Sequence, residues 1–172
     1  MRLSSESIER LILPQLESVQ VKLCTVKVSG PPFNPLIQVF IDREEGHISI
    51  DDCTGLTRSV QNSLDLEDST PPNYRLEVSS PGTDWPLTEL WQFRKNIGRT
   101  IRLKRPIALP NSQGKADRRV SEVRIIAVTE NEKIRLGLLE HPSEADNFER
   151  TVQELAGACV IFEILNKKSK RK

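Results

Sequence analysis

Three reactive side chains stand side by side in this sequence, and a histidine precedes them. Asp51, Asp52 and Cys53 are consecutive, and His47 lies four residues before Asp51. A thiol nucleophile needs a base and positively charged surroundings that favour the thiolate. Two adjacent carboxylates have the opposite effect, because they raise the energy of the sulfur anion. The cluster therefore favours a structural thiol, and a hydrolase built on Asp51, Asp52 and Cys53 is the lesser alternative.

The same carboxylates, together with Asp42, could offer oxygen ligands to a metal ion. Their spacing matches no metal-binding loop, and His141 is distant in sequence. A simpler interpretation makes Asp52 a helix N-cap and lets Asp51 interact with the helix dipole. The sequence also lacks a Gly-rich phosphate loop and the serine-hydrolase motifs. We therefore expect no catalytic residue, no metal and no cofactor, and a protein that is not an enzyme.

The first half of the chain must position these residues, and its patterns predict helices on a small sheet. A helix should begin at Ser4 or Ser5, and Pro14 should bend it or split it near Leu13. Its apolar face comprises Ile8, Leu11, Ile12, Leu16 and Val19. Two strands are marked by the alternating residues Cys24, Val26, Val28, Ile37, Val39 and Ile41. A second helix, capped by Asp51 or Asp52, carries an apolar stripe of Cys53, Leu56, Val60 and Leu64.

The second half has a different character after a short helix near residues 88–96, which Gly98 can end. Short alternating segments follow, with apolar positions at Ile101, Leu103, Val123, Ile125, Ile134, Leu136, Leu138, Val160, Phe162 and Ile164. Several short strands with charged outer positions predict a small closed barrel. Polar loops at residues 106–117 and 140–149 should project from it.

Charge is divided unevenly between the two halves. Residues 1–90 hold 7 Lys and Arg against 14 Asp and Glu, a net charge of −7. Residues 91–172 hold 18 against 10, a net charge of +8. The division indicates either two surfaces for two partners, or solubility together with a basic tail. Charge alone leaves these two interpretations open.

The basic residues of the second half are candidates for contacts with nucleic acid. Neutralising phosphates requires several cations on one face. The candidates are Arg99, Arg102, Lys104, Arg105, Lys115, Arg118, Arg119, Lys167, Lys168, Lys170 and Arg171. Aromatic side chains for base stacking are few, with five Phe, two Trp and one Tyr. We therefore expect recognition of shape and phosphates, without reading of sequence.

Two further features bear on location. The three cysteines lie far apart, without a Cys-x-x-Cys pair, which favours a reducing compartment. No apolar run approaches the ~20 residues needed to span a bilayer, and no signal-peptide core is visible. We expect a cytosolic protein with no membrane partner.

The segment from Tyr74 to Leu87 is the most distinctive in the chain. Tyr74, Leu76 and Val78 alternate with polar residues as in a half-buried strand. A Pro-Gly turn follows, in which glycine can take the positive φ of a type II turn. A second proline then stops the strand. We interpret this block as a hinge between two packed units, or as a turn needed only for folding, with Ser79, Ser80, Pro81, Gly82, Asp84 and Pro86 as its residues.

This segment resembles the bacterial ribosome maturation factor family RimP. The resemblance also rests on Val39-Phe40-Ile41-Asp42, Ile50-Asp51-Asp52-Cys53 and Leu64-Asp65. Residues 93–98 and the strands after them match more loosely. The family usually has Leu-Asp-Arg-Pro-Leu where this chain has Thr83-Asp84-Trp85-Pro86-Leu87. Trp85 stands at the position of the family's arginine, so this chain lacks the positive charge with which relatives could contact RNA or a carboxylate there.

The resemblance implies both a fold and a function. The fold would be an α+β domain at residues 1–84, an SH3-like (Sm-like) barrel at 85–165 and a basic flexible tail at 166–172. The function would be that of a non-enzymatic assembly factor for the small (30S) ribosomal subunit. It would bind the immature particle through 16S rRNA and a ribosomal protein of the decoding centre, as a monomer without a small-molecule substrate. The alternative is a general Sm-like RNA-binding protein without ribosome specificity.

Overall fold

The computed structural model describes residues 4–82, 85–110, 116–139 and 147–161. The chain divides into two compact units, residues 1–81 and 82–172, and each is described by itself. No helix among the described residues is both long enough and apolar enough to cross a membrane.

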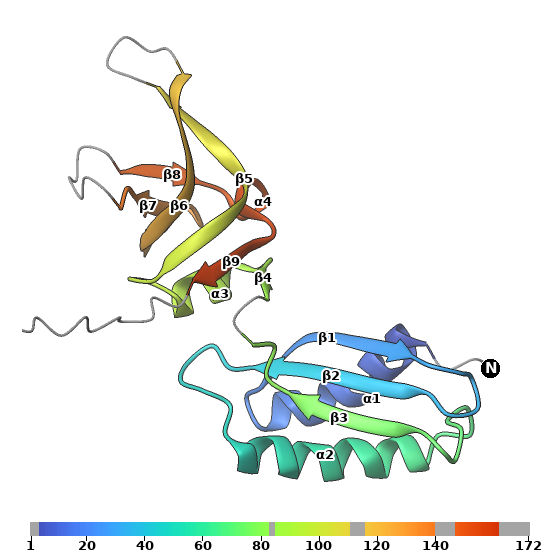
Figure 1. Ribbon diagram of the computed structural model, residues 1–172. Helices are drawn as coiled ribbons and strands as arrows, with labels where there is room; N and C mark the ends of the chain where they lie inside the picture. Colours follow the sequence, from blue (N-terminus) through green and yellow to red (C-terminus); the bar gives the residue numbers. More distant parts are fainter. Residues whose placement is uncertain (1–3, 83–84, 111–115, 140–146, 162–172) are drawn as a thin grey trace, which may run out of the picture. The chain divides into compact units, whose positions relative to one another are not determined.

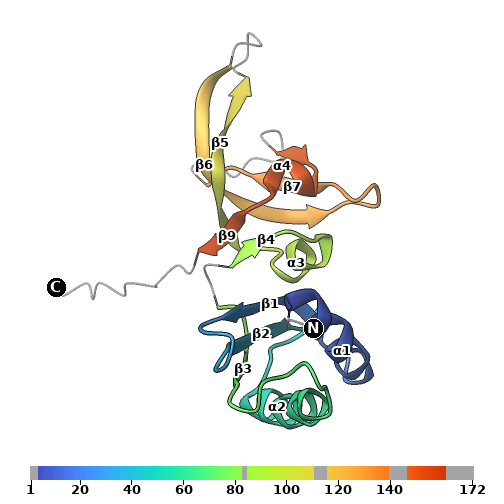
Figure 2. The same cartoon turned by 90° about the vertical axis from the view of Figure 1, so that its right-hand side faces the viewer.

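The first unit has the predicted order α-β-β-α-β. Its elements are α1 (Ser5–Ser18), β1 (Lys22–Ser29), β2 (Leu36–Asp42), α2 (Ile50–Asp65) and β3 (Arg75–Ser79). The sheet order is β1-β2-β3, with β1 antiparallel and β3 parallel to β2. Both helices cover one face of the sheet (Figures 1 and 2). The two-layer domain of helices on a three-stranded sheet is therefore confirmed.

The core of this unit lies between the sheet and the helices. Every second residue of the central strand β2, namely Ile37, Val39 and Ile41, is fully buried. Leu56, Val60 and Leu64 of α2 join them, as predicted, whereas Cys53 is half-buried.

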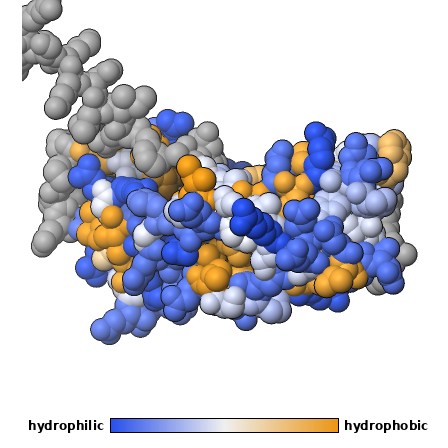
Figure 3. Space-filling view, turned by 90° about the horizontal axis from the view of Figure 1, so that it is seen from below, coloured by the Kyte–Doolittle hydropathy of each residue, from blue (hydrophilic) through white to orange (hydrophobic). Residues whose placement is uncertain are grey.

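Hydrophobic residues on the face in Figure 3 lie as separate spots among hydrophilic ones. Scattered exposed apolar residues of this kind are normal for protein surfaces.

Helix α1 begins as predicted but is not split. The hydroxyl of the N-cap Ser4 accepts a hydrogen bond of 3.2 Å from the backbone N–H of Ser7. Pro14 lies inside a single α-helix, because Ile8, Ile12 and Leu16 on its buried face hold both halves against the sheet. The prediction for Val19 is wrong, since this residue lies beyond the last turn and is 44% exposed.

The N-cap of helix α2 lies two or three residues before the predicted Asp51 or Asp52, so the cap is a different residue. Ser49 is the N-cap, and its hydroxyl accepts a hydrogen bond of 3.0 Å from the backbone N–H of Asp52. The Asp52 carboxylate accepts a hydrogen bond of 2.9 Å from the backbone N–H of Ser49. This reciprocal pair is a capping box. Neither Asp51 nor Asp52 is the N-cap, and both lie in the first turn.

The second unit is built on a six-stranded sheet with two short helices. Its elements are β4 (Pro86–Leu87), α3 (Leu90–Lys95), β5 (Thr100–Pro110), β6 (Ala116–Val128), β7 (Ile134–Gly137), β8 (Phe148–Arg150), α4 (Val152–Leu155) and β9 (Ala158–Ile161). The strand order is β4-β9-β5-β6-β7-β8, with antiparallel pairing throughout. The core contains Phe93, Ile101, Val123, Ile125, Ile134 and Leu136, all fully buried.

The predicted closed barrel is not found in the described part of the chain. The sheet is open, because its two end strands β4 and β8 do not pair with each other. These strands have only two and three residues in the described part of the chain. The predicted loop at 106–117 is also wrong, since β5 continues to Pro110 and β6 begins at Ala116. Most of the loop at 140–149, together with Phe162 and Ile164, lies outside the described residues.

Candidate functional site

Asp52, in the first turn of α2, is held by structural contacts. The Arg43 guanidinium lies 2.8 Å from one oxygen of Asp52, and the Ser49 hydroxyl donates a hydrogen bond of 2.7 Å to the other. Hydrogen bonds from the Ser49 backbone and side chain lower the pKa of Asp52, and the charge of Arg43 adds to this. One oxygen of Asp42 accepts a hydrogen bond of 2.9 Å from the backbone N–H of Arg43. This arrangement fixes the loop before α2.

Cys53 has the surroundings of a structural thiol. Burial raises its pKa, and the neighbouring charge of Asp52 raises it further. A raised pKa leaves little thiolate near neutral pH, so the side chain is a poor nucleophile. His47 is exposed, and the described residues contain no group of three His, Cys, Asp or Glu able to hold a metal ion. The geometry gives no support to a hydrolase or a metal site at this position.

Tyr74 and Asp65 form a contact that sequence reasoning missed. The Tyr74 hydroxyl donates a hydrogen bond of 2.7 Å to Asp65, linking the last residue of α2 to the residue before β3. Burial, followed by the interaction with Asp65, raises the pKa of Tyr74 to about 12. The sequence shows the two residues in separate motifs, Leu64-Asp65 and the segment that begins at Tyr74. Their pairing required the tertiary fold, because the loop between them has no periodic pattern.

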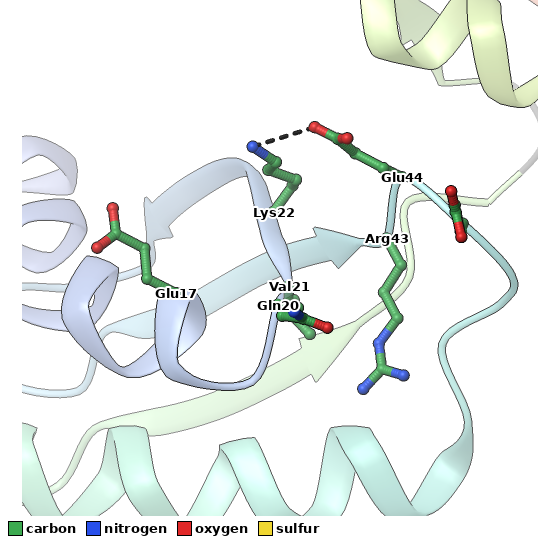
Figure 4. A pocket seen from close by; sticks show the side chains of 7 residues that line it. Glu17, Gln20, Val21, Lys22, Arg43 and Glu44 are labelled. Carbon is green, nitrogen blue, oxygen red and sulfur yellow. Dashed lines mark ion pairs between the residues drawn. The ribbon is translucent and has the colours of Figure 1, made fainter.

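A polar groove lies at one end of the first unit, between the α1–β1 turn and the segment after β2 (Figure 4). It is lined by Glu17, Gln20, Val21, Lys22, Arg43, Glu44 and Glu45. Lys22 and Glu44 form an ion pair of 3.1 Å, while Arg43 points away from them toward α2. This ion pair is half-exposed and therefore contributes little to stability. The lining contains three carboxylates and two cations, in keeping with the acidic first half.

The predicted hinge residues follow β3. Ser79 is the last residue of this strand, and Ser80 is exposed beyond it. Gly82 has a φ of +72°, the left-handed region that the Pro-Gly turn requires. A Cβ at Gly82 would have no neighbour within 4 Å, so the backbone angle alone favours glycine here. Pro86 begins β4, whereas Asp84 lies outside the described residues.

The second unit gathers charged side chains on the side of its sheet away from the core. We call this surface the outer sheet face; its charged residues are Arg102, Lys104, Glu122, Arg124, Arg135 and Glu149. Arg102 pairs with Glu122 at 3.2 Å, and Arg135 pairs with Glu149 at 3.1 Å. These pairs are largely exposed and weak, so their cations can exchange a carboxylate for a phosphate at small cost. The face has four cations and two carboxylates.

The predicted cations are only partly brought together. Arg102 and Lys104 lie on the outer sheet face, and the stem of Lys104 packs over Gly157. Arg99 is half-buried in the turn before β5 and donates a hydrogen bond of 3.2 Å to Asn96. Arg105 and Arg119 are exposed farther along β5 and β6. The side chain of Arg118 is not described, and Lys115, Lys167, Lys168, Lys170 and Arg171 lie outside the described residues.

Two cations of the outer sheet face, Arg124 and Arg135, were missed by the sequence analysis. Each lies on a strand whose inward residues are fully buried, Ile125 on β6 and Leu136 on β7. The alternation of these strands could have placed Arg124 and Arg135 on the outer side. Their closeness to Arg102 depended on the strand order, which the alternation does not supply.

A comparison with protein-family models finds a match for the first unit. Residues 11–84 match the model described as the RimP N-terminal domain. The matched region runs from within α1 through β3 and contains the α2 capping box, the Tyr74–Asp65 pair and the Pro81-Gly82 turn.

Proposed function

Since the chain belongs to the RimP family of ribosome maturation factors, we propose that it assists the maturation of the small (30S) ribosomal subunit. The observation that carries the proposal is the match over residues 11–84, which includes every motif of the first unit. The chain acts without catalysis or cofactor and works in the cytoplasm, as a monomer. Its binding partner is the immature subunit.

Two surfaces support a bipartite mode of binding. The outer sheet face of the second unit presents Arg102, Lys104, Arg124 and Arg135, and cations grouped in this way suit the phosphates of 16S rRNA. The acidic first half, with a net charge of −7 over residues 1–90, suits the basic extensions of a ribosomal protein of the decoding centre. The outer sheet face and the acidic first half thus each suit a partner of opposite charge.

The proposed mechanism is a shift of population. A protein that binds one conformation of a particle more tightly than another raises the population of that conformation. The size of the shift is limited by the difference between the two affinities. The protein would hold the nascent subunit in an intermediate state and leave when maturation removes the preferred conformation.

The experiment is gradient sedimentation of a lysate from cells that make the tagged protein. We expect the tag to migrate with free small subunits and to be absent from translating ribosomes. Migration only at the top of the gradient, at low as well as physiological salt, would refute the proposal.

The outer sheet face also favours a second candidate, a general Sm-like RNA-binding protein. Such a protein would bind free RNA with a steep salt dependence and would show no preference for ribosomal particles. Adding excess unrelated RNA to the lysate separates the two functions. The tag would leave the small-subunit fractions if binding were general, and would remain there if the particle is the specific partner.

A further inference from the structure

Strands β5 and β6 extend beyond the rest of their sheet. β5 pairs with β9 only at Thr100–Arg102, and β6 pairs with β7 only at Arg124–Val128. Among the described residues, the pairs from Ile107–Val120 to Pro110–Ala116 join these two strands alone. The pair runs out from the remaining strands in Figure 1. We call residues 103–110 and 116–121, which comprise these pairs and the residues between them and the sheet, the β5–β6 arm.

A large bulge forms the base of this arm. Between the pairs Arg102–Glu122 and Ile107–Val120, residues 103–106 of β5 lie opposite Ser121 alone on β6. Such a bulge bends the strand and redirects its side chains. Lys104 and Arg105 are both exposed in it. The bulge therefore presents two adjacent cations where the arm leaves the sheet.

The two sides of the arm differ in character. Ile107 and Val120 lie opposite each other and pack against the core of the second unit, which anchors this side. Ala108 and Arg119 form the next pair, and both are exposed. Arg105 lies in the bulge, three residues before Ala108. The arm thus holds separated cations on an anchored ribbon, and they can meet different phosphates.

The composition of the ribbon limits the kind of partner it fits. From Thr100 to Val128 the sequence contains no aromatic residue and no histidine. Proteins that hold single-stranded nucleic acid stack its bases on aromatic side chains. Double-stranded RNA is bound instead through its shape, its phosphates and its 2′-hydroxyls. Two-stranded β-ribbons of other proteins lie in the grooves of duplex DNA.

We propose that the β5–β6 arm binds the backbone of double-stranded RNA, with Lys104, Arg105 and Arg119 contacting phosphates across a groove. The inference rests on the proposed function, which makes a helix of ribosomal RNA the duplex in question. Beyond that function, it specifies which part of the chain binds RNA and that the bound RNA is double-stranded. No reading of base sequence is involved.

The test measures binding of the full-length protein to a labelled RNA duplex of about 20 base pairs, at several salt concentrations. A DNA duplex of the same sequence and a single RNA strand are measured in parallel. The variant is Arg105→Gln with Arg119→Gln. The control is Arg58→Gln with Arg75→Gln, which removes two exposed cations from the first unit. Lys104 is kept, because its stem packs over Gly157.

We expect the RNA duplex to bind more tightly than the single strand or the DNA duplex. The arm variant should weaken duplex binding about 5- to 30-fold and lower the salt slope by about two. The control should match the unchanged protein. Equal duplex affinity and salt slope in the arm variant, or tighter binding of the single strand, would overturn the inference.

Sedimentation of the same variants separates this inference from the proposed function. If the arm variant binds the duplex like the unchanged protein and still migrates with small subunits, the inference fails and the proposed function stands. If the unchanged protein binds duplex RNA through the arm but does not migrate with small subunits, the proposed function fails and the arm remains an RNA-binding element.

Discussion

At the residue scale, the reactive side chains of the first unit serve its fold. Asp52 completes a capping box and pairs with Arg43, and Cys53 is a half-buried thiol with a raised pKa. Asp65 accepts a hydrogen bond from Tyr74. These contacts join the loops at both ends of α2 to the rest of the unit. The motif residues therefore stabilise the fold of the first unit.

The Tyr74–Asp65 hydrogen bond yields the first prediction, which is simple to observe because the sequence contains a single tyrosine. A raised folded-state pKa of about 12 means that the folded protein keeps its phenolic proton more tightly than the unfolded chain. The stabilisation is complete below the unfolded pKa of about 10 and is lost as pH rises toward the folded value. Ultraviolet titration of tyrosinate should show less than half ionisation at pH 11.

A titration midpoint near the ordinary tyrosine value would contradict this assignment. Tyr74→Phe provides the matched control, because it removes the hydroxyl and leaves the ring. It should lower the free energy of unfolding by about 0.5–1 kcal/mol at neutral pH. In the unchanged protein, the free energy of unfolding falls at alkaline pH partly because Tyr74 ionises. The Tyr74→Phe variant should lack this part of the fall.

At the scale of elements, helices and buried strands followed from the sequence, whereas sheet closure did not. The order α-β-β-α-β was predictable because Ile37, Val39 and Ile41 alternate and the stripe Leu56, Val60 and Leu64 has helical spacing. The closed barrel is not confirmed in the described residues, where the end strands β4 and β8 do not pair with each other. Such pairing depends on strand register, which the alternation of apolar residues does not supply. The two-residue strand β4 and the one-turn helix α4 are too short to show a period.

The candidate site shows the same limit. Arg102 and Lys104 were found because they are close in sequence, while Arg124 and Arg135 join them only through the strand pairing. The N-cap of α2 could have been found from sequence. Ser49 stands three residues before Asp52, the spacing of a reciprocal cap.

The capping box yields a prediction for α2. Ser49→Ala should lower the free energy of unfolding by about 1 kcal/mol at neutral pH, the usual cost of losing a serine N-cap. The pKa of Asp52 lies below its ordinary value in the folded state, so its contribution is present above the unfolded pKa of about 4 and is lost on acidification. The stability difference from the unchanged protein should therefore narrow below that pH.

Urea unfolding at a series of pH values measures this effect. Ser49→Thr is the matched control, because threonine also caps helices and should preserve most of the stability. Equal free energies of unfolding for Ser49→Ala and the unchanged protein at neutral pH would show that the cap does not stabilise the fold.

At the scale of the whole molecule, two compact units meet at the Pro81-Gly82 turn in the sequence. We propose that this turn sets the path of the chain between the units and thereby allows both to contact one particle. Gly82→Ala tests this role, since its backbone φ of +72° is unfavourable for alanine by about 1 kcal/mol. Gly46→Ala is the control, because Gly46 has a φ of +75° and equally open surroundings.

Both glycine variants should remain folded and lose similar stability in thermal unfolding. Only Gly82→Ala should lose binding to small subunits. A comparable loss in both variants, or none in either, would leave the turn with a role in folding alone.

The proposed function requires the protein to bind the immature small subunit more tightly than the mature one, and a competition experiment measures this difference. Labelled protein bound to small subunits from cells that lack it is challenged with unlabelled immature or mature subunits. We predict that immature particles displace the label at a concentration at least about tenfold lower than mature ones, which corresponds to about 1.4 kcal/mol of differential affinity. Equal displacement by both particles would refute the proposed function, because a protein without differential affinity cannot shift the population toward either state.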